Sequence, residues 1–146
     1  MTNEEAQAKN HGVTVGIIGG AGYTAGELIR ILRHHPKVGD IEVQSTSHFG
    51  EPLSKAHPDL LGETDARFQD RLSSACSLVF LCSGHGKTQE IFASDVLPRS
   101  AKVIDLSADA RWEYGTDRHV CCNHEFVYGL AELQHESIAT ATHLAN

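Results

Sequence analysis

The stretch VTVGIIGGAGYTAGELIRILRHHP, residues 13–36, decides the fold that this sequence predicts. It begins with a short β-branched run at Val13–Ile18, which is typical of a buried strand. The glycine-rich turn GGAGYTAG comes next, and apolar residues then recur at helical spacing from Ala25 to His34, where Pro36 stops the pattern. A strand, a glycine turn and a helix in this order indicate the start of a parallel α/β sheet.

Strand-like and helix-like segments continue to alternate beyond this stretch. Further strands are expected at residues 41–47, 77–83 and 102–108. Helical spacing of Ile91, Phe92 and Val96 predicts a helix between the last two, and residues 49–74 are expected to hold a short helix and a strand near Arg67–Phe68. The sequence therefore predicts a Rossmann-type, doubly wound, mostly parallel sheet with helices on both faces.

Composition excludes several classes of protein. With 146 residues, 40% hydrophobic and 21% charged, the chain is expected to form one soluble globular domain. A net charge of −7 with scattered lysines and arginines excludes a nucleic-acid surface. No apolar stretch approaches the ~20 residues needed to span a bilayer. Residues 1–12 are polar and acidic, so they are interpreted as a disordered leader of a cytoplasmic protein rather than a signal peptide.

The four cysteines are also consistent with a cytoplasmic protein, because their positions do not suggest disulfides. Cys76 and Cys82 lie in or beside an apolar run, which favours small buried residues over a disulfide frame. The segment HVCCNHE at residues 119–125 contains the usual zinc ligands. However, adjacent cysteines rarely present both thiolates to one tetrahedral ion, and no paired C-x-x-C is present. No metal site is therefore predicted.

The glycine turn carries the chemistry. Gly20, Gly22 and Ala25 satisfy G-x-G-x-x-A between a strand and a helix. Glycine permits positive φ in a tight turn, and its missing Cβ lets the backbone approach a pyrophosphate at the helix N-terminus. A glycine-rich turn without a ligand is the alternative, but the strand and helix around it favour a dinucleotide site. The expected cofactor-binding residues here are Gly19, Gly20, Ala21, Gly22, Tyr23, Thr24 and Ala25.

The end of the second expected strand indicates which dinucleotide binds. NAD-specific sites place a carboxylate there, whereas this chain has Ser45, Thr46 and Ser47, with Glu42 too early in the strand. Hydroxyl and backbone N–H groups can bind a 2′-phosphate that a carboxylate repels, so NADP (NADPH) is favoured as the cofactor. The alternative is that these are merely polar residues at the end of a strand.

A third segment is expected at the same edge of the sheet. Ser83, Gly84 and His85 follow the strand at 77–83, where the carboxyl ends of parallel strands face a ligand. We expect them to contact the cofactor, with a simple strand-to-helix turn as the alternative. Because no nucleophile is identifiable beside His85, a positioning role is favoured over a catalytic one.

Five motifs follow one another in an order and spacing that resemble a known family. They are VGIIGGAGYTAGELIRIL at 15–32, HPDLLG at 57–62, LVFLCSGHG at 78–86, VIDLSADAR at 103–111 and FVYGLAEL at 126–133. From Val13 to Asn146 the chain resembles the N-acetyl-gamma-glutamyl-phosphate reductases of arginine biosynthesis. The resemblance implies hydride transfer from NADPH to an acyl-enzyme thioester, a small-molecule substrate, and a homo-oligomer when the protein is full length.

The resemblance also implies what the chain is expected to lack. In the family, the run similar to THLAN continues into Pro-Gly-Cys, whose cysteine is the nucleophile, and a further domain carries the catalytic histidine. The chain reaches Asn146 just before that point, so residues 13–146 are expected to be the NADP-binding domain without the catalytic domain. None of the four cysteines is assigned a catalytic role.

The resemblance suggests that Ser107 and Arg111 contact the substrate. For Arg111, a surface ion pair with Asp109 or Glu113 is the alternative.

Two other functions remain as alternatives. One is a stand-alone NADP-binding module without catalysis. The other is a sugar-nucleotide epimerase or short-chain reductase, which shares the glycine turn but requires Tyr-x-x-x-Lys. None of the three tyrosines, Tyr23, Tyr114 and Tyr128, has a lysine four residues later, so this class is disfavoured.

Overall fold

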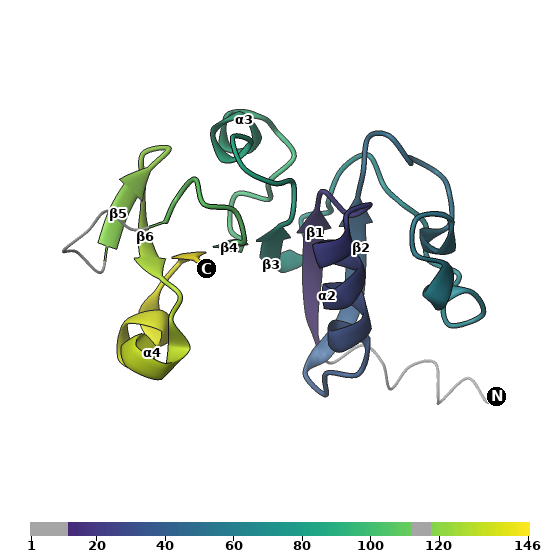
Figure 1. The fold of residues 1–146 in the computed structure, drawn as a ribbon, viewed down its shortest axis with the longest axis horizontal. Helices are drawn as coiled ribbons and strands as arrows, with labels where there is room; N and C mark the ends of the chain where they lie inside the picture. Colours follow the sequence, from purple (N-terminus) through teal and green to yellow (C-terminus); the bar gives the residue numbers. More distant parts are fainter. Residues whose placement is uncertain (1–11, 112–117) are drawn as a thin grey trace.

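The computed structural model describes residues 12–111 and 118–146 (Figure 1). The strands are β1 Val13–Ile18, β2 Val38–Gln44, β3 Cys76–Leu81, β4 Lys102–Asp105, β5 Arg118–Cys121, β6 His124–Tyr128 and β7 His143–Ala145. The α-helices are α2 Tyr23–Arg33, α3 Thr88–Ala93 and α4 Ala131–Thr140, with short 3₁₀ turns at Leu53–Lys55 and Pro58–Leu60. No helix in the described residues is long and apolar enough to cross a membrane.

The strands form one sheet in the order β2-β1-β3-β4-β7-β6-β5. Neighbouring strands run parallel except for β5 and β6, which form an antiparallel hairpin at one edge. From β1 the chain crosses through α2 to β2 on one side, and β3 then pairs with β1 on the other side. The direction of winding therefore reverses between β1 and β3, which is where open α/β sheets bind ligands. The predicted Rossmann-type sheet is confirmed.

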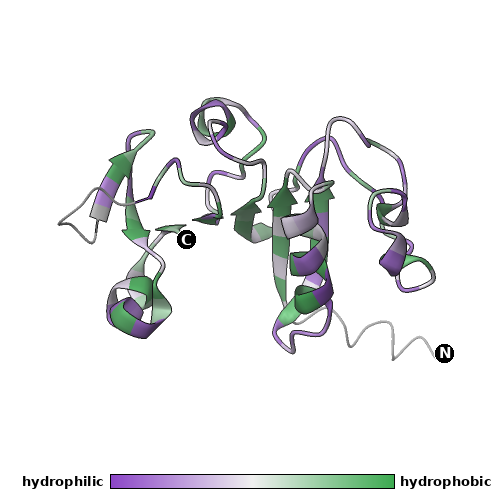
Figure 2. Ribbon diagram, viewed as in Figure 1, coloured by the Kyte–Doolittle hydropathy of each residue, from purple (hydrophilic) through white to green (hydrophobic). Residues whose placement is uncertain are grey.

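Apolar residues cover both faces of the sheet. On one face Ile29 of α2 packs in a buried cluster with Val15 and Ile17 of β1. On the other face Ile91 of α3 belongs to a second cluster that includes Val79. Successive strand residues point to opposite faces, so the continuous apolar runs of β1 and β3 feed both clusters. Figure 1 shows α2 lying across β1 and β2, and Figure 2 shows the hydrophobic colouring of the strands behind it.

Several predicted boundaries were wrong by a few residues. Strand β2 begins and ends three residues earlier than 41–47. It ends at Gln44 because Ser45 leaves the β1 ladder and donates its N–H to the Gln69 carbonyl oxygen at 3.1 Å. Strand β4 ends at Asp105 rather than 108. There the Asp105 Oδ1 accepts the Ser107 N–H at 2.7 Å, and such a side-chain bond two residues ahead replaces the strand with a turn.

The segment between β2 and β3 differs from its prediction. Two 3₁₀ turns stand where one short helix was expected, and Arg67 forms only an isolated bridge with Pro52. This segment still packs into the core, because Phe68 and Leu60 are each only 1% exposed beneath α2.

The last third of the chain contains elements that were not predicted. Strand β5, strand β6, helix α4 and strand β7 all lie here. Cys121 ends β5, and Cys122 lies in the hairpin turn that follows it. Helix α4 has no buried residue and is interrupted at Gln134, whose φ is −126°. It therefore presents no apolar stripe from which a helix could be predicted.

Candidate functional site

Two glycines of the turn after β1 are required by the fold itself. Gly19 has φ 80°, and a Cβ there would lie 2.7 Å from the Cα and N atoms of Ser83. A Cβ at Gly20 would lie 2.1 Å from Cγ1 of Val43. The turn thus sits directly against the ends of β2 and β3, at the position where the winding reverses.

Gly22 has no such requirement. Its φ of −81° and ψ of 163° are open to any residue, and the nearest atom to a Cβ built there is the Gly19 carbonyl oxygen at 3.8 Å. Gly22 caps α2 without a side-chain hydrogen bond, and the first turn of the helix contains no acidic residue. The glycine therefore leaves open space beside the positive end of the helix.

Backbone donors face this open space. Among the described residues, no hydrogen-bond acceptor occupies the N–H groups of Tyr23, Thr24 and Ala25. Tyr23 and Thr24 are exposed, whereas Ala25 is fully buried, so the open donors at this helix start are those of Tyr23 and Thr24. These are the first N–H groups of α2, which have no partner inside the helix. Unpaired donors, the helix dipole and an absent Cβ together fit the phosphates of a dinucleotide. The turn predicted to bind the cofactor is therefore built as such a site requires.

His57 supports the glycine turn through a hydrogen bond to its backbone. Its ring is only 6% exposed, and Nε2 donates to the Gly20 carbonyl oxygen at 2.7 Å. The ring fills the place of the missing Cβ of Gly26, which would lie 2.6 Å from Nδ1. His57 was not predicted as part of the site, although it begins the HPDLLG motif. The extra glycine in the helix was the available signal.

The residues after β2 divide into one buried and two exposed hydroxyls. Ser45 is only 6% exposed and its Oγ lies 3.3 Å from the Ser47 Oγ. Thr46 and Ser47 are exposed, and Ser47 Oγ also lies 2.9 Å from Nδ1 of His48. Thr46, Ser47 and the imidazole of His48 are thus available to a ligand at this end of β2, whereas Ser45 serves the packing.

The segment after β3 presents a histidine in a defined state. Gly84 has φ 80°, and His85 beyond it is exposed. The Ala108 N–H donates to Nδ1 of His85 at 2.8 Å. Because Nδ1 accepts this bond, the neutral imidazole carries its proton on Nε2. Nε2 therefore offers an N–H donor at the carboxyl edge of the sheet.

Two carboxylates, Asp105 and Asp109, hold the segment that follows His85 through hydrogen bonds. The Asp109 side chain accepts the N–H of Gly86 at 2.7 Å and of Thr88 at 3.1 Å, and these bonds, that from Gly86 foremost, lower the pKa of Asp109. Thr88 Oγ1 donates to the fully buried Asp105 at 2.6 Å and lies 3.1 Å from the Ser107 Oγ. The hydroxyl of Ser107, a predicted substrate contact, is therefore committed to this buried network.

Arg111 lies on the exposed side of the same edge. Its Nε donates to the carbonyl oxygen of Asn146 at 3.1 Å, and a second nitrogen lies 3.5 Å from the Leu106 carbonyl oxygen. In the described residues it makes no ion pair with Asp109, and Glu113 lies outside those residues. The guanidinium thus lies beside the end of β7 without an ion pair to any described carboxylate.

Cys76, at the start of β3, and Cys82, just after its end, are poor nucleophiles. Burial raises the pKa of Cys76 to about 12, and burial together with the Asp105 charge raises that of Cys82 to about 12. Both thiols are protonated at neutral pH, and the thiolate is the reactive form. In the part of the chain that the structure describes, no group of three or more His, Cys, Asp or Glu side chains could hold a metal ion.

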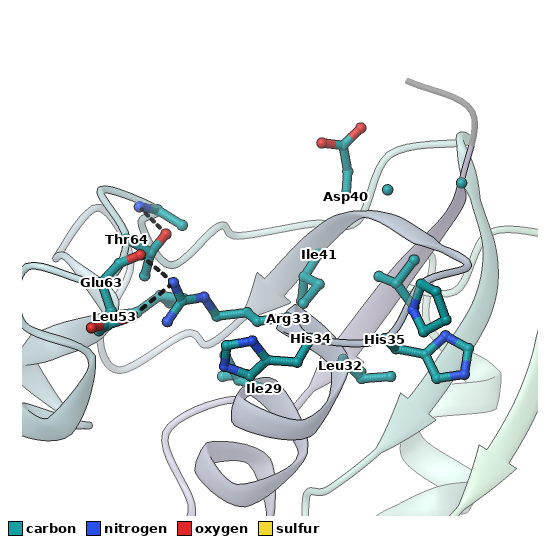
Figure 3. Close-up of a pocket in the computed structure, with 15 residues that line it drawn as sticks. Ile29, Leu32, Arg33, His34, His35, Asp40, Ile41, Leu53, Glu63 and Thr64 are labelled. Atoms are coloured by element: carbon teal, nitrogen blue, oxygen red, sulfur yellow. Dashed lines mark hydrogen bonds and ion pairs between the residues drawn. The ribbon is translucent and has the colours of Figure 1, made fainter. Parts of the chain in front are cut away.

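A well-formed cavity lies away from the glycine turn. It measures about 690 Å³ and is lined by Arg33, His34, His35, Asp40 and Glu63, among others (Figure 3). Arg33 already donates to the carbonyl oxygen and the carboxylate of Glu63. The cavity surrounds the C-terminal end of α2, where the helix dipole is negative and disfavours phosphate. The open N–H donors lie at the opposite end of this helix.

Comparisons with known proteins identify the family of the chain. The sequence profile of the family described as "Semialdehyde dehydrogenase, NAD binding domain" matches residues 14–141. The chain is 43% identical over 134 residues to an N-acetyl-gamma-glutamyl-phosphate reductase of Christiangramia forsetii. It is 43% identical over 135 residues to that of Bacteroides thetaiotaomicron and 44% identical over 134 residues to that of Flavobacterium johnsoniae. These matches span 92% of the chain and 40% of each relative.

A pair of alanine substitutions tests the two kinds of glycine. Gly26→Ala is expected to destabilise the protein by about 1–3 kcal/mol, because its Cβ would lie 2.6 Å from the His57 ring. Gly22→Ala, the matched control, is expected to change stability by less than about 0.5 kcal/mol. Chemical denaturation of the ligand-free variants measures both. Equal stabilities of the two variants would contradict the packing of His57 against Gly26.

Proposed function

The chain belongs to the family of semialdehyde dehydrogenase NAD-binding domains, and from that premise we propose that it binds NADPH as the cofactor-binding part of an N-acetyl-gamma-glutamyl-phosphate reductase. The observation that carries the proposal is Gly22, which no contact within the chain requires and which leaves the α2 N-terminus open. The chain spans about 40% of the length of the curated relatives that it matches, so the activity of the whole protein is part of the proposal.

The pyrophosphate is proposed to lie on the turn from Gly19 to Ala25. The N–H groups of Tyr23 and Thr24 have no other partner among the described residues and belong to exposed residues at the helix start. Gly22 allows the phosphates to approach them closely. Charge-assisted hydrogen bonds of this kind are stronger than neutral ones, so an acidic chain can hold an anion here.

The 2′-phosphate is proposed to lie beside the exposed hydroxyls of Thr46 and Ser47. No carboxylate follows β2 directly, and His48, 2.9 Å from Ser47, adds a group that can donate to the phosphate. Such surroundings favour NADPH over NADH. The Ser83–His85 segment forms the third wall, with Nε2–H of His85 as its donor.

When bound, NADPH supplies a hydride. The proposed substrate is an acyl phosphate, and Arg111, exposed beside Asn146, is proposed to attract its negative charge. The backbone around Ser107 and Ala108 lines the same edge. A homo-oligomer in the cytoplasm is proposed for the complete protein.

NADP binding without turnover is the second candidate for this chain. It is favoured by the protonated thiols of Cys76 and Cys82, whose pKa values of about 12 leave them unsuited to attack an acyl phosphate.

Cofactor preference is tested by Ser47→Asp. The added carboxylate would repel a 2′-phosphate and could bind a ribose 2′-hydroxyl, so NADPH affinity should fall by roughly tenfold or more while NADH affinity does not. Fluorescence titration of both nucleotides, with Ser47→Asn as the uncharged control, gives the ratio. If the unsubstituted chain binds NADH as tightly as NADPH, the assignment of the residues after β2 is wrong.

Gly22→Val tests the seat of the pyrophosphate. The branched side chain would enter the space beside the N–H groups of α2 and cost one or two charge-assisted hydrogen bonds of about 1.5–3 kcal/mol each. NADPH binding should weaken at least about tenfold, since each 1.4 kcal/mol is a factor of ten.

A thermal melt of ligand-free Gly22→Val should remain close to that of the parent chain, because no described atom lies within 3.8 Å of the first added carbon. Near-native NADPH affinity in this folded variant would mean that the cofactor is not seated on the turn.

A further inference from the structure

In the hairpin between β5 and β6, a cysteine occupies a turn position whose backbone conformation cysteine rarely adopts. Cys121 pairs with His124 across the hairpin, and the two residues between them, Cys122 and Asn123, have φ values of 55° and 63°. Two positive φ values give the turn that matches the twist of paired strands. Asparagine adopts this conformation readily, but cysteine does so rarely. Backbone preference therefore does not explain Cys122.

This conformation brings two sulfur atoms together. In an extended strand, consecutive side chains point to opposite faces of the sheet. The change to positive φ at Cys122 turns its side chain back beside that of Cys121, and the Sγ atoms lie 3.2 Å apart. Cys121 is anchored against the buried cluster of Ala110, Phe126 and Ala145. Both cysteines remain partly exposed, so a small reagent can reach them.

Cys122 is held as a neutral thiol. Burial, the hydrogen bond with Cys121 and the charges of Asp105 and Asp109 raise the pKa of Cys122 to about 12. Reagents that require a thiolate therefore react slowly here. An oxide whose oxygen is replaced by the sulfur atoms of two neutral thiols gives a product of unchanged net charge. The negative charges of Asp105 and Asp109 do not disfavour that reaction.

We propose that Cys121 and Cys122 form a dithiol site that chelates one trivalent arsenical. Arsenic in this state is thiophilic and pyramidal, so its two sulfur ligands lie on the same side, as the two Sγ atoms do at 3.2 Å. With phenylarsine oxide, two As–S bonds form, both S–H bonds break, and the oxygen leaves as water carrying the two protons. No electron is transferred, so no oxidant or reductant is needed.

The donor set favours this ligand over a metal ion. A structural zinc site needs four ligands, and in the described residues no third His, Cys, Asp or Glu joins the two sulfurs in a group that could hold a metal. A trivalent organoarsenical brings its own third substituent and needs only the two thiols. The inference depends on the hairpin alone and is independent of the proposed cofactor function, since β5 and β2 lie at opposite edges of the sheet.

The test is intact-mass analysis of the reduced, folded chain after incubation with phenylarsine oxide and excess 2-mercaptoethanol. One phenylarsenic adduct per chain is expected, stable to the monothiol and removed by 2,3-dimercaptopropanol. Cys121→Ser and Cys122→Ser should each weaken binding roughly 100-fold, because the second bond forms within an already tethered complex. Cys82→Ser, the control at a partly buried single thiol, should bind as the parent chain does.

A second pair of variants separates the turn from the mere presence of adjacent cysteines. Asn123→Gly keeps positive φ available and should retain the affinity, whereas Asn123→Pro fixes φ near −65° and should lower it. Thermal melts establish that each variant is folded. Absence of the adduct in the folded parent chain, its persistence in both serine variants at position 121 or 122, or equal affinities of the two Asn123 variants would overturn the proposal.

Discussion

The close approach of the Gly19 backbone to Ser83 is the contact on which the candidate site depends. It presses the turn after β1 against the end of β3, with no room for a Cβ, and so fixes where α2 begins. His57 supports the turn from the other side through the Gly20 carbonyl oxygen. Because both supports act on the backbone, the first N–H groups of α2 are held in place before any ligand arrives, which lowers the cost of binding.

The two ends of α2 differ in the sign of the helix dipole and in which backbone groups are unpaired. The N-terminal end has unpaired N–H groups and open space at Gly22. The C-terminal end borders the cavity of about 690 Å³, and its arginines, Arg30 and Arg33, are already paired with carboxylates. Cavity volume alone would select the C-terminal end. The direction of the helix dipole and the positions of free donors select the N-terminal end for an anionic ligand.

The sequence predicted the first four strands and helices α2 and α3, because apolar residues recur in them at the spacing of a strand or a helix. The turn at Gly19–Ala25 was also predictable, since its glycines combine a backbone requirement with a ligand requirement. His57 was not, because it meets Gly20 across 37 residues of sequence and no local pattern encodes that contact.

The same reason hid the role of Thr88, which meets Asp105 across 17 residues. The hairpin was missed because its turn is Cys122–Asn123 instead of a glycine-containing pair, and α4 was missed because it buries no residue.

Amide chemical-shift mapping of the ¹⁵N-labelled chain during titration with NADPH tests the central claim most directly. The account predicts shifts in the amides of the Gly19–Ala25 turn, of Thr46–Ser47 and of Ser83–His85. The amides of Arg33–His35 and Glu63, at the opposite end of α2, should not move. Shifts confined to that second group would contradict the account, because they would place the nucleotide in the cavity lined by Arg33 and Glu63 instead of on the glycine turn.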